Sequence, residues 1–495
     1  MTFAYAPFSL WFIPFISLPL IFFLHFRYAL SGFKSGFFFG LGWFGAGISW
    51  VHVSIANFGG LPLLGSLALM ALLVAYLSLF PAGALWLSQK FSPTKYQILV
   101  ITACWFLFEW LRSWFLTGFP WLSLGYTQST SPLAGWYPVI GETGVSALLL
   151  VTGCLLGKLV APSHQTKQQK AKPIAVSLLF LTLSTLLASS FTFTEKQPEV
   201  VNIAMAQGNI KQELRWVPEQ DEPTMQKYLA LSENLWHNDV ILWPEAAIPK
   251  LEPLATRYLQ ELDQLAFETN TGLITGIVNY NFETYEAFNN LIVLGKAAQD
   301  ATGPEYQYFH QNRYSKHHLL PVGEFIPMED WLRGLAPIFD LPMSSFSRGA
   351  YEQPNLLVNG HHFVAAICFE IAFPRQIQAN LRQKSDFLLT VSNDAWFGDS
   401  HGPAQHLEIA QVRAAEFGLP LIRATNNGIT AYVDHHGKVI AQAPQFSSAT
   451  LEVALHKVSG MTAYRYWGDM PLWLFTIVTL GFATIATKRQ RRTHS

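Results

Sequence analysis

Seven long apolar stretches constrain this chain most strongly, because a helix that crosses a bilayer needs about 20 predominantly apolar residues. They lie at residues 7–26, 36–54, 61–88, 97–116, 143–160, 174–193 and 471–487. Only 13% of the 495 residues are charged, well below the share usual in soluble domains, and most of the charges follow residue 194. The sequence predicts a polytopic helical membrane domain over 1–194, a soluble domain over 195–468, and a last membrane helix with a basic tail over 469–495.

Basic residues follow alternate apolar stretches. Lysine or arginine is found after the first, third, fifth and last stretches, whereas the connections at 57–60 and 118–142 contain neither. Because cytoplasmic connections of membrane proteins carry the excess of lysine and arginine, we expect the soluble domain to lie outside the cytoplasm. An odd number of stretches with a cytoplasmic basic tail then places Met1 on the outer side.

Short apolar runs alternate with helical patterns after residue 194. Runs rich in branched residues predict strands at 200–205, 239–243, 273–278, 290–294, 363–367 and 387–391. Amphipathic spacing predicts helices at 224–236, 253–268 and 406–417. Strands interleaved with helices are typical of an α/β domain.

Three predicted strand ends carry side chains of reactive types. Cys368, which lies outside the apolar stretches, follows the strand at 363–367; Glu245 follows a strand that ends in Trp-Pro; and Lys316 precedes a second carboxylate, Glu324, by eight residues. A lone cysteine is often only a small buried apolar residue. Together, however, a carboxylate that accepts the thiol proton, a cation that favours thiolate and oxyanion, and a thiol are what acyl transfer requires.

This combination resembles the Glu-Lys-Cys triad of the nitrilase superfamily, and the chain as a whole is similar to the membrane branch of that superfamily, the apolipoprotein N-acyltransferase family. The similarity is carried by segments in both domains, at 50–56, 117–122, 207–210, 243–245, 391–398 and 423–428. It implies an αββα sandwich for the soluble domain, a bacterial inner membrane with the sandwich in the periplasm, and no metal or organic cofactor.

The resemblance also implies roles for individual residues. Cys368 is the expected nucleophile, Glu245 the general base and Lys316 the oxyanion stabiliser, while Glu324 and Glu370 orient the lysine and the thiol. The implied reaction moves the sn-1 acyl chain of a phospholipid, typically phosphatidylethanolamine, onto the thiol as a thioester. The acceptor is the N-terminal amine of a diacylglyceryl-cysteine apolipoprotein.

Four further residues are implied to bind substrate or lipid: Trp216, Phe369, Asn393 and Trp396. Phe369 stands where the family commonly has tyrosine, so no hydrogen bond from that hydroxyl is expected. The family usually has one more apolar stretch before residue 6, which implies either a later start here or an outer N-terminus. We also expect a mobile lid over 334–349, a monomer, and no nucleic-acid partner.

Two other functions stay open on the residues alone. A membrane-tethered amidase or nitrilase would use the same triad with water as the acceptor, although a single anchor would suffice for tethering. A transporter or receptor would need ionisable or broken-helix features in the apolar stretches, where Glu109 and Arg112 are expected to pair with each other.

Zinc could bind the histidine pairs at 317–318, 361–362 and 435–436, but no metal-ligand spacing accompanies them.

Overall fold

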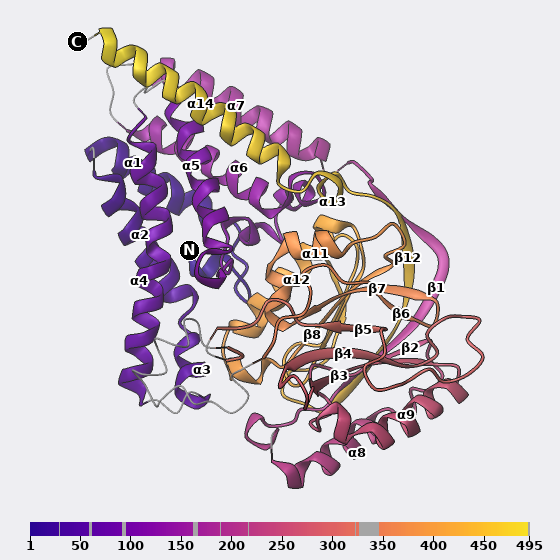
Figure 1. Cartoon of the computed structure of the whole chain (residues 1–495). Coiled ribbons are helices and arrows are strands. Elements are labelled where there is room, and N and C mark those ends of the chain that lie inside the picture. The colour runs from indigo at the N-terminus through magenta and orange to yellow at the C-terminus, as the bar shows by residue number, and fades with distance from the viewer. Residues whose placement is uncertain are drawn as a thin grey trace. The chain divides into compact units, whose positions relative to one another are not determined.

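The computed structural model describes residues 1–28, 30–58, 62–91, 96–161, 167–188, 190–215, 217–321, 323–325 and 346–493. The chain divides into two compact units, one of residues 1–57, 61–193 and 461–495 and one of residues 58–60 and 194–460. The first unit is helical and the second is α/β (Figure 1).

The helical unit contains apolar helices that can span a membrane. Its helices are α1 (Pro14–Tyr28), α2 (Gly32–Gly47), α3 (Val51–Phe58), α4 (Leu63–Ser88), α5 (Gln97–Arg112), α6 (Tyr137–Val160), α7 (Lys167–Ala188), α13 (Ala463–Trp467) and α14 (Met470–Thr493). Within the described ranges, three helices are long and apolar enough to cross a bilayer, or four if the bent pair α2 and α3 is one span. A helical region whose helices could span a membrane is therefore confirmed, while the number of seven spans stays a prediction.

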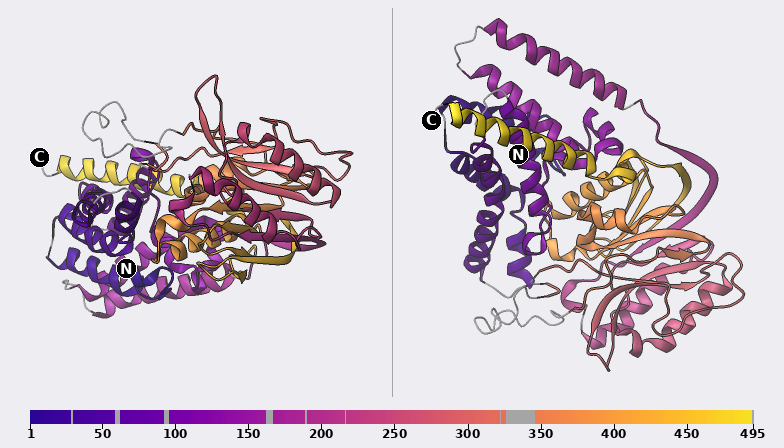
Figure 2. Two further views of the ribbon diagram at one scale, coloured as in Figure 1. Left: turned by 90° about the horizontal axis from the view of Figure 1, so that it is seen from below. Right: turned by 45° about the horizontal axis from the view of Figure 1, so that its top comes forward.

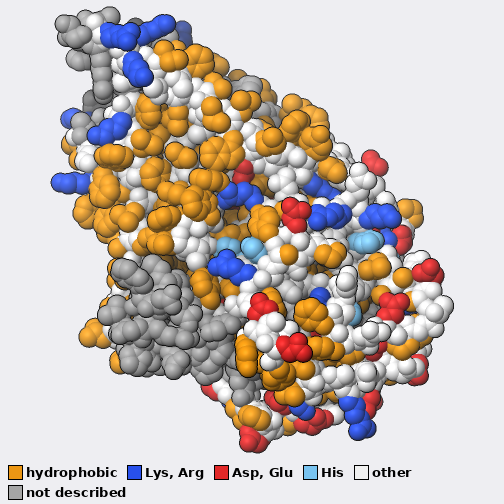
Figure 3. All heavy atoms as spheres, viewed as in Figure 1, with side chains coloured by type: hydrophobic (Ala, Val, Ile, Leu, Met, Phe, Trp, Pro, Cys, Tyr) orange, Lys and Arg blue, Asp and Glu red, His pale blue; other side chains and the backbone are white. Residues whose placement is uncertain are grey.

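Hydrophobic side chains cover the helical unit, whereas acidic side chains gather over the α/β unit (Figure 3). Leu64, Phe38 and Phe482 are 82%, 68% and 69% exposed. Large contiguous apolar surfaces of this kind mark a membrane or protein interaction site. In helices with so few charges, the physical reason for such exposure is contact with lipid.

Glycines allow α2 and α4 to pack closely. Gly32, Gly36 and Gly40 repeat every four residues on α2, and a Cβ atom at any of them would lie within 2.8 Å of the α4 backbone. Hydrocarbon gives little hydrophobic drive for one helix to bind another, so membrane helices rely on such close backbone approach. The spacing of the small residues therefore fixes which faces of α2 and α4 meet.

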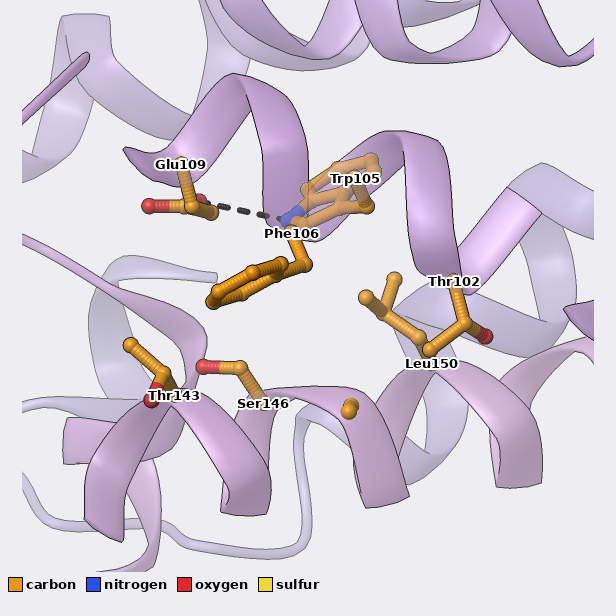
Figure 4. A pocket seen from close by; sticks show the side chains of 8 residues that line it. Thr102, Trp105, Phe106, Glu109, Thr143, Ser146 and Leu150 are labelled. Atoms are coloured by element: carbon orange, nitrogen blue, oxygen red, sulfur yellow. Dashed lines mark hydrogen bonds between the residues drawn. The ribbon is translucent and has the colours of Figure 1, made fainter. Parts of the chain in front are cut away.

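A small pocket lies between α5 and α6 (Figure 4). Glu109 lines it and accepts a hydrogen bond from Trp105 Nε1 at 3.2 Å. The same carboxylate forms an ion pair with Arg112, which confirms the expected pairing. Arg112 Nη1 also donates to the carbonyls of Phe119 and Trp121 at 2.5 and 2.7 Å. The pair therefore ties the loop after α5 to the end of that helix.

The α/β unit contains two six-stranded sheets, in the orders β12-β1-β2-β3-β4-β5 and β11-β10-β9-β8-β7-β6. Figure 2 shows the ribbon of the chain from two further directions. In each sheet the three central strands run parallel and the outer ones antiparallel. The strands are β1 (Thr194–Gln207), β2 (Val240–Leu242), β3 (Gly272–Tyr280), β4 (Ala287–Gly295), β5 (Arg313–Ser315), β6 (Leu356–Val358), β7 (His361–Ile367), β8 (Phe387–Ser392), β9 (Leu421–Thr425), β10 (Ala431–Val433), β11 (Val439–Gln442) and β12 (Ala449–Gly460). The helices are α8 (Asp221–Leu231), α9 (Thr256–Glu268), α11 (Pro374–Asn380) and α12 (Gly402–Phe417).

Side chains along β1 point alternately to the two faces of its sheet, and this shows how the layers form. Ile203 and Met205 pack in a core between the two sheets, together with Ile367 of β7 and Leu389 of β8. Ala204, between them, faces the core beneath α8 and α9. Successive strand residues point to opposite faces, so one apolar strand serves two cores. The expected αββα sandwich is confirmed.

All six predicted strands and all three predicted helices are present, with ends shifted by a few residues. The strands that the sequence analysis missed are short or lie at sheet edges. Along the first eight residues of β12, partly or fully buried positions alternate with exposed ones, and three of the four exposed ones are polar, so no continuous apolar run marks this strand.

Candidate active site

Strand ends bring the three predicted reactive side chains into one site. Glu245 lies three residues after β2, Lys316 directly follows β5, and Cys368 directly follows β7. Ends of parallel strands meet at one edge of a sheet, where α/β proteins usually place their sites. The positions follow from the topology, because β2 and β5 belong to one sheet and β7 to the sheet packed on it.

The Glu245 carboxylate is buried and held at both oxygens. Its side chain is 8% exposed, Oε1 accepts a hydrogen bond from Asn289 Nδ2 at 2.7 Å, and Oε2 accepts one from the backbone N–H of Asn393 at 2.9 Å. Arg215 donates to the Glu245 carbonyl at 3.0 Å. These contacts fix the carboxylate in one orientation, as a positioned proton acceptor requires.

Lys316 lies between two carboxylates. Its ammonium is 2.8 Å from Glu324 and 3.7 Å from Glu245 Oε1, and the residue is 1% exposed. Burial alone would lower the pKa of Lys316, but Glu324 and Glu245 hold that pKa above its usual range. The side chain is therefore a fixed positive charge at every physiological pH.

Cys368 begins a short 3-10 helix in a strained backbone conformation. Its φ is +55°, in the left-handed region that side-chain-bearing residues seldom adopt and that is often found at functional sites. Burial and the neighbouring Glu245 carboxylate raise the pKa of Cys368 to about 12, although Lys316 acts in the opposite direction. The resting sulfur is therefore a thiol, and its proton must leave as the sulfur attacks.

The raised pKa predicts how Cys368 reacts with iodoacetamide. The rate constant should rise about tenfold per pH unit from pH 6 to 10 without a plateau, because the thiolate fraction does so below the pKa. The measurement is the alkylation rate at the Cys368 peptide by mass spectrometry, with unfolded protein as the control. A plateau near pH 7 would mean that the enzyme rests as a thiolate.

Glu370 organises the backbone around the site. Oε1 accepts hydrogen bonds from the N–H groups of His317 and His318 at 2.8 and 2.9 Å, and Oε2 accepts one from Ile367 N at 2.8 Å. Tyr314 donates to the same carboxylate at 3.0 Å. This one side chain thus ties the segment that carries Lys316 to the residue before Cys368.

Gly276 on β3 lets the Glu245 segment pack closely. A Cβ atom at this position would lie 2.3 Å from Ala246 N and 2.6 Å from Pro244 O. We expect Gly276→Ala to displace the Glu245 carboxylate and lower kcat by about tenfold to a hundredfold, because small misplacements of reacting groups are costly. Enzyme assays and thermal unfolding check this. Gly303→Ala is the control, since a Cβ there meets nothing within 4 Å; equal activity of the two variants would contradict the prediction.

The remaining predicted residues lie in different surroundings. Phe369 is buried against the ring of Phe373, with centroids 5.1 Å apart. Asn393 is buried, and its side chain bonds Gln212 at 2.5 Å and Asn426 at 2.9 Å. Trp396 is partly exposed. Trp216 and most of the expected lid at 334–349 lie outside the described residues.

The sequence analysis missed Asn289, whose side-chain N–H group donates both to Glu245 and to Glu324 Oε1, the latter at 3.1 Å. No signal marks this residue, because its partners lie at distant positions in the chain. It also missed Ser392 and Asp394, although both belong to the segment 391–398 that carried the resemblance. Ser392 Oγ lies 3.4 Å from the Cys368 sulfur.

The site has the groups for covalent catalysis at a carbonyl carbon. It combines a thiol, a fixed carboxylate and a fixed cation, which can supply the nucleophile, the base and the stabiliser of a tetrahedral oxyanion. Across the described ranges, no group of three or more His, Cys, Asp or Glu side chains is arranged to hold a metal ion.

Comparison with known proteins agrees with this chemistry. Residues 1–155 match the model of the apolipoprotein N-acyltransferase N-terminal domain, and residues 202–466 match the carbon-nitrogen hydrolase model. An apolipoprotein N-acyltransferase of Photobacterium profundum is 44% identical over 99% of this chain and 93% of its own length. The Vibrio cholerae enzyme of the same name is 43% identical over 99% and 95%. The chain therefore belongs to the apolipoprotein N-acyltransferase family.

Proposed function

We propose that this protein moves the sn-1 acyl chain of a phospholipid, through a thioester on Cys368, to the N-terminal amine of an S-diacylglyceryl-cysteine apolipoprotein. The observation that carries the proposal is the cluster of the partly buried Cys368 with the buried Glu245 and Lys316, in a chain that also has helices able to span a membrane. Phosphatidylethanolamine is the expected donor. The site is expected to face the periplasm of a bacterial inner membrane, and the enzyme is expected to be a monomer.

In the first half-reaction Glu245 takes the proton of the Cys368 thiol while the sulfur attacks the ester carbonyl of the donor. The Lys316 ammonium stabilises the oxyanion of the tetrahedral intermediate. The intermediate collapses as the carbon–oxygen bond of the ester breaks, and the departing alkoxide takes the proton back from Glu245. The products are an acyl thioester and a lysophospholipid.

In the second half-reaction the free amine of the apolipoprotein attacks the thioester. Glu245 accepts a proton from the amine nitrogen, Lys316 again stabilises the oxyanion, and the carbon–sulfur bond breaks. The leaving sulfur is reprotonated by Glu245, which regenerates the thiol and leaves an amide. An amine outcompetes water only if the acceptor lipid is positioned and water is excluded.

The alternative is a hydrolase that uses the same groups with water as the acceptor. The lipid-exposed apolar helices favour a membrane lipid as the donor over a soluble amide. We do not expect release of free fatty acid to exceed transfer when an amine acceptor is present.

A two-stage mass measurement tests the proposal. The purified chain is incubated with phosphatidylethanolamine that carries different sn-1 and sn-2 chains, and intact mass should show an adduct of the sn-1 chain that hydroxylamine removes. A diacylglyceryl-cysteine peptide should then discharge the adduct, whereas the same peptide with an acetylated N-terminus should not. Discharge to free fatty acid with either peptide would support the hydrolase instead.

A further inference from the structure

A buried polar cluster lies next to Cys368 and contacts its sulfur through Ser392 and its backbone through His406. Asp394, His406 and Arg423 are fully buried, and they come from the loop after β8, from α12 and from β9. Arg423 Nη2 donates to Asp394 Oδ2 at 2.6 Å. A buried ion pair that also makes hydrogen bonds to its neighbours holds a fixed geometry.

Two contacts join this cluster to the nucleophile. Ser392 Oγ lies 3.4 Å from the Cys368 sulfur and 2.6 Å from Asp394 Oδ1. His406 Nε2 lies 3.0 Å from the Cys368 carbonyl. The cluster therefore contacts the Cys368 sulfur through the Ser392 hydroxyl. It contacts the strained backbone of Cys368 through the His406 imidazole.

The positions of the protons follow from the partners. A carbonyl only accepts, so His406 carries its proton on Nε2, and Nδ1 accepts from Arg423 Nη2 at 3.0 Å. Burial and the Arg423 charge lower the pKa of His406, which agrees with a neutral ring. Burial alone would raise the pKa of Asp394, but the Arg423 charge and the Ser392 hydroxyl hold it well below its usual range. The unprotonated Nδ1 of His406 lies 3.2 Å from Asp394 Oδ1 and donates nothing to it. Asp394 is therefore an anion that only accepts hydrogen bonds.

Ser392 has a single hydroxyl proton and two acceptors within reach. The Asp394 carboxylate is much nearer than the sulfur and carries a full charge, so it holds the proton in the resting enzyme. A thiolate can be stabilised by Ser392 only if the hydroxyl turns away from Asp394.

We propose that Ser392 is a positioning residue that stabilises the Cys368 thiolate, and that Asp394, held by Arg423, restrains Ser392 by drawing its hydroxyl proton away from the sulfur. The inference rests on the proposed role of Cys368 as the nucleophile. It explains how a sulfur can stay a thiol at rest and still gain a hydrogen-bond donor as negative charge develops on it.

Two substitutions should change thiol reactivity in opposite directions. Ser392→Ala removes the donor, so alkylation of Cys368 by iodoacetamide at pH 8 should slow about threefold to tenfold. In Asp394→Asn the amide oxygen stays on Arg423, and its NH2 group then donates to Ser392 Oγ. The hydroxyl proton is free to turn to the sulfur, and a nearby negative charge is lost, so alkylation should accelerate about threefold or more.

The experiment uses the full chain in detergent, with alkylation quantified at the Cys368 peptide from pH 6 to 10. The other charged groups that act on the sulfur, Glu245, Lys316 and Arg215, are the same in every variant. Ser385→Ala is the matched control, because Ser385 is also buried and hydrogen-bonded but precedes β8 at the strand's other end. It should react like the wild type.

A slower alkylation rate in Ser392→Ala together with a faster one in Asp394→Asn supports the proposal. A wild-type alkylation rate in Ser392→Ala overturns it. An equal or slower rate in folded Asp394→Asn overturns the restraint by Asp394. If Asp394→Asn does not fold, because Arg423 has lost its counter-charge, Ser392→Ala decides alone. Alkylation needs no lipid, so failure of the proposed acyl transfer would appear in the adduct assay and not here.

Discussion

Replacing Cys368 by alanine or serine is expected to lower acyl transfer by about 10⁴-fold or more, because no other group in the site can form the thioester. The serine hydroxyl is a much weaker acid than the thiol, so Glu245 cannot activate it well. Neither variant should show the adduct that hydroxylamine removes. The measurement is intact mass after incubation with phosphatidylethanolamine, followed by the rate of acylation of the acceptor peptide.

Cys104→Ala is the control for this experiment. Cys104 is buried on α5 of the helical unit and takes no part in the site, so this variant should still carry the acyl chain. An adduct of normal mass on Cys368→Ala would place the nucleophile elsewhere and would overturn the assignment of the whole site.

Lys316→Met is expected to lower kcat by about 10³-fold, because the oxyanion loses its cation in a buried site. It should also lower the free energy of unfolding by about 3 to 5 kcal/mol, since Glu245 and Glu324 are left as close buried carboxylates without a counter-charge.

Lys457→Met is the matched control, because Lys457 also contacts two carboxylates, Glu199 at 2.9 Å and Asp386 at 3.5 Å, but is more exposed. We expect it to change stability by less than about 1 kcal/mol, as for other solvent-screened ion pairs, and to leave kcat unchanged. Chemical denaturation and steady-state rates of both variants give the comparison. If Lys316→Met kept its kcat, the oxyanion would have to be stabilised by other donors.

The sequence alone singled out the three reactive side chains that the structure brings together. Cys368 and Glu245 follow apolar runs that form strands, whereas Lys316 follows the short strand β5, which is not an apolar run. The apolar stretches likewise identified helices suited to a membrane, although among the described residues only three or four helices are long and apolar enough to cross one. Both kinds of signal are local, because they depend on residues close together in the chain.

Tertiary structure decided the surroundings of these groups. Asn289 bridges Glu245 and Glu324, and Glu370 joins the Lys316 segment to the strand before Cys368. The Asp394–Arg423 pair forms next to the nucleophile only because β8 and β9 are neighbouring strands. Apart from the bond between Glu370 and Ile367, these contacts join residues 29 to 53 positions apart, and no local pattern encodes them. Apolar periodicity determines which residues are buried, whereas the hydrogen-bond partners of a buried polar group depend on which strands pack together.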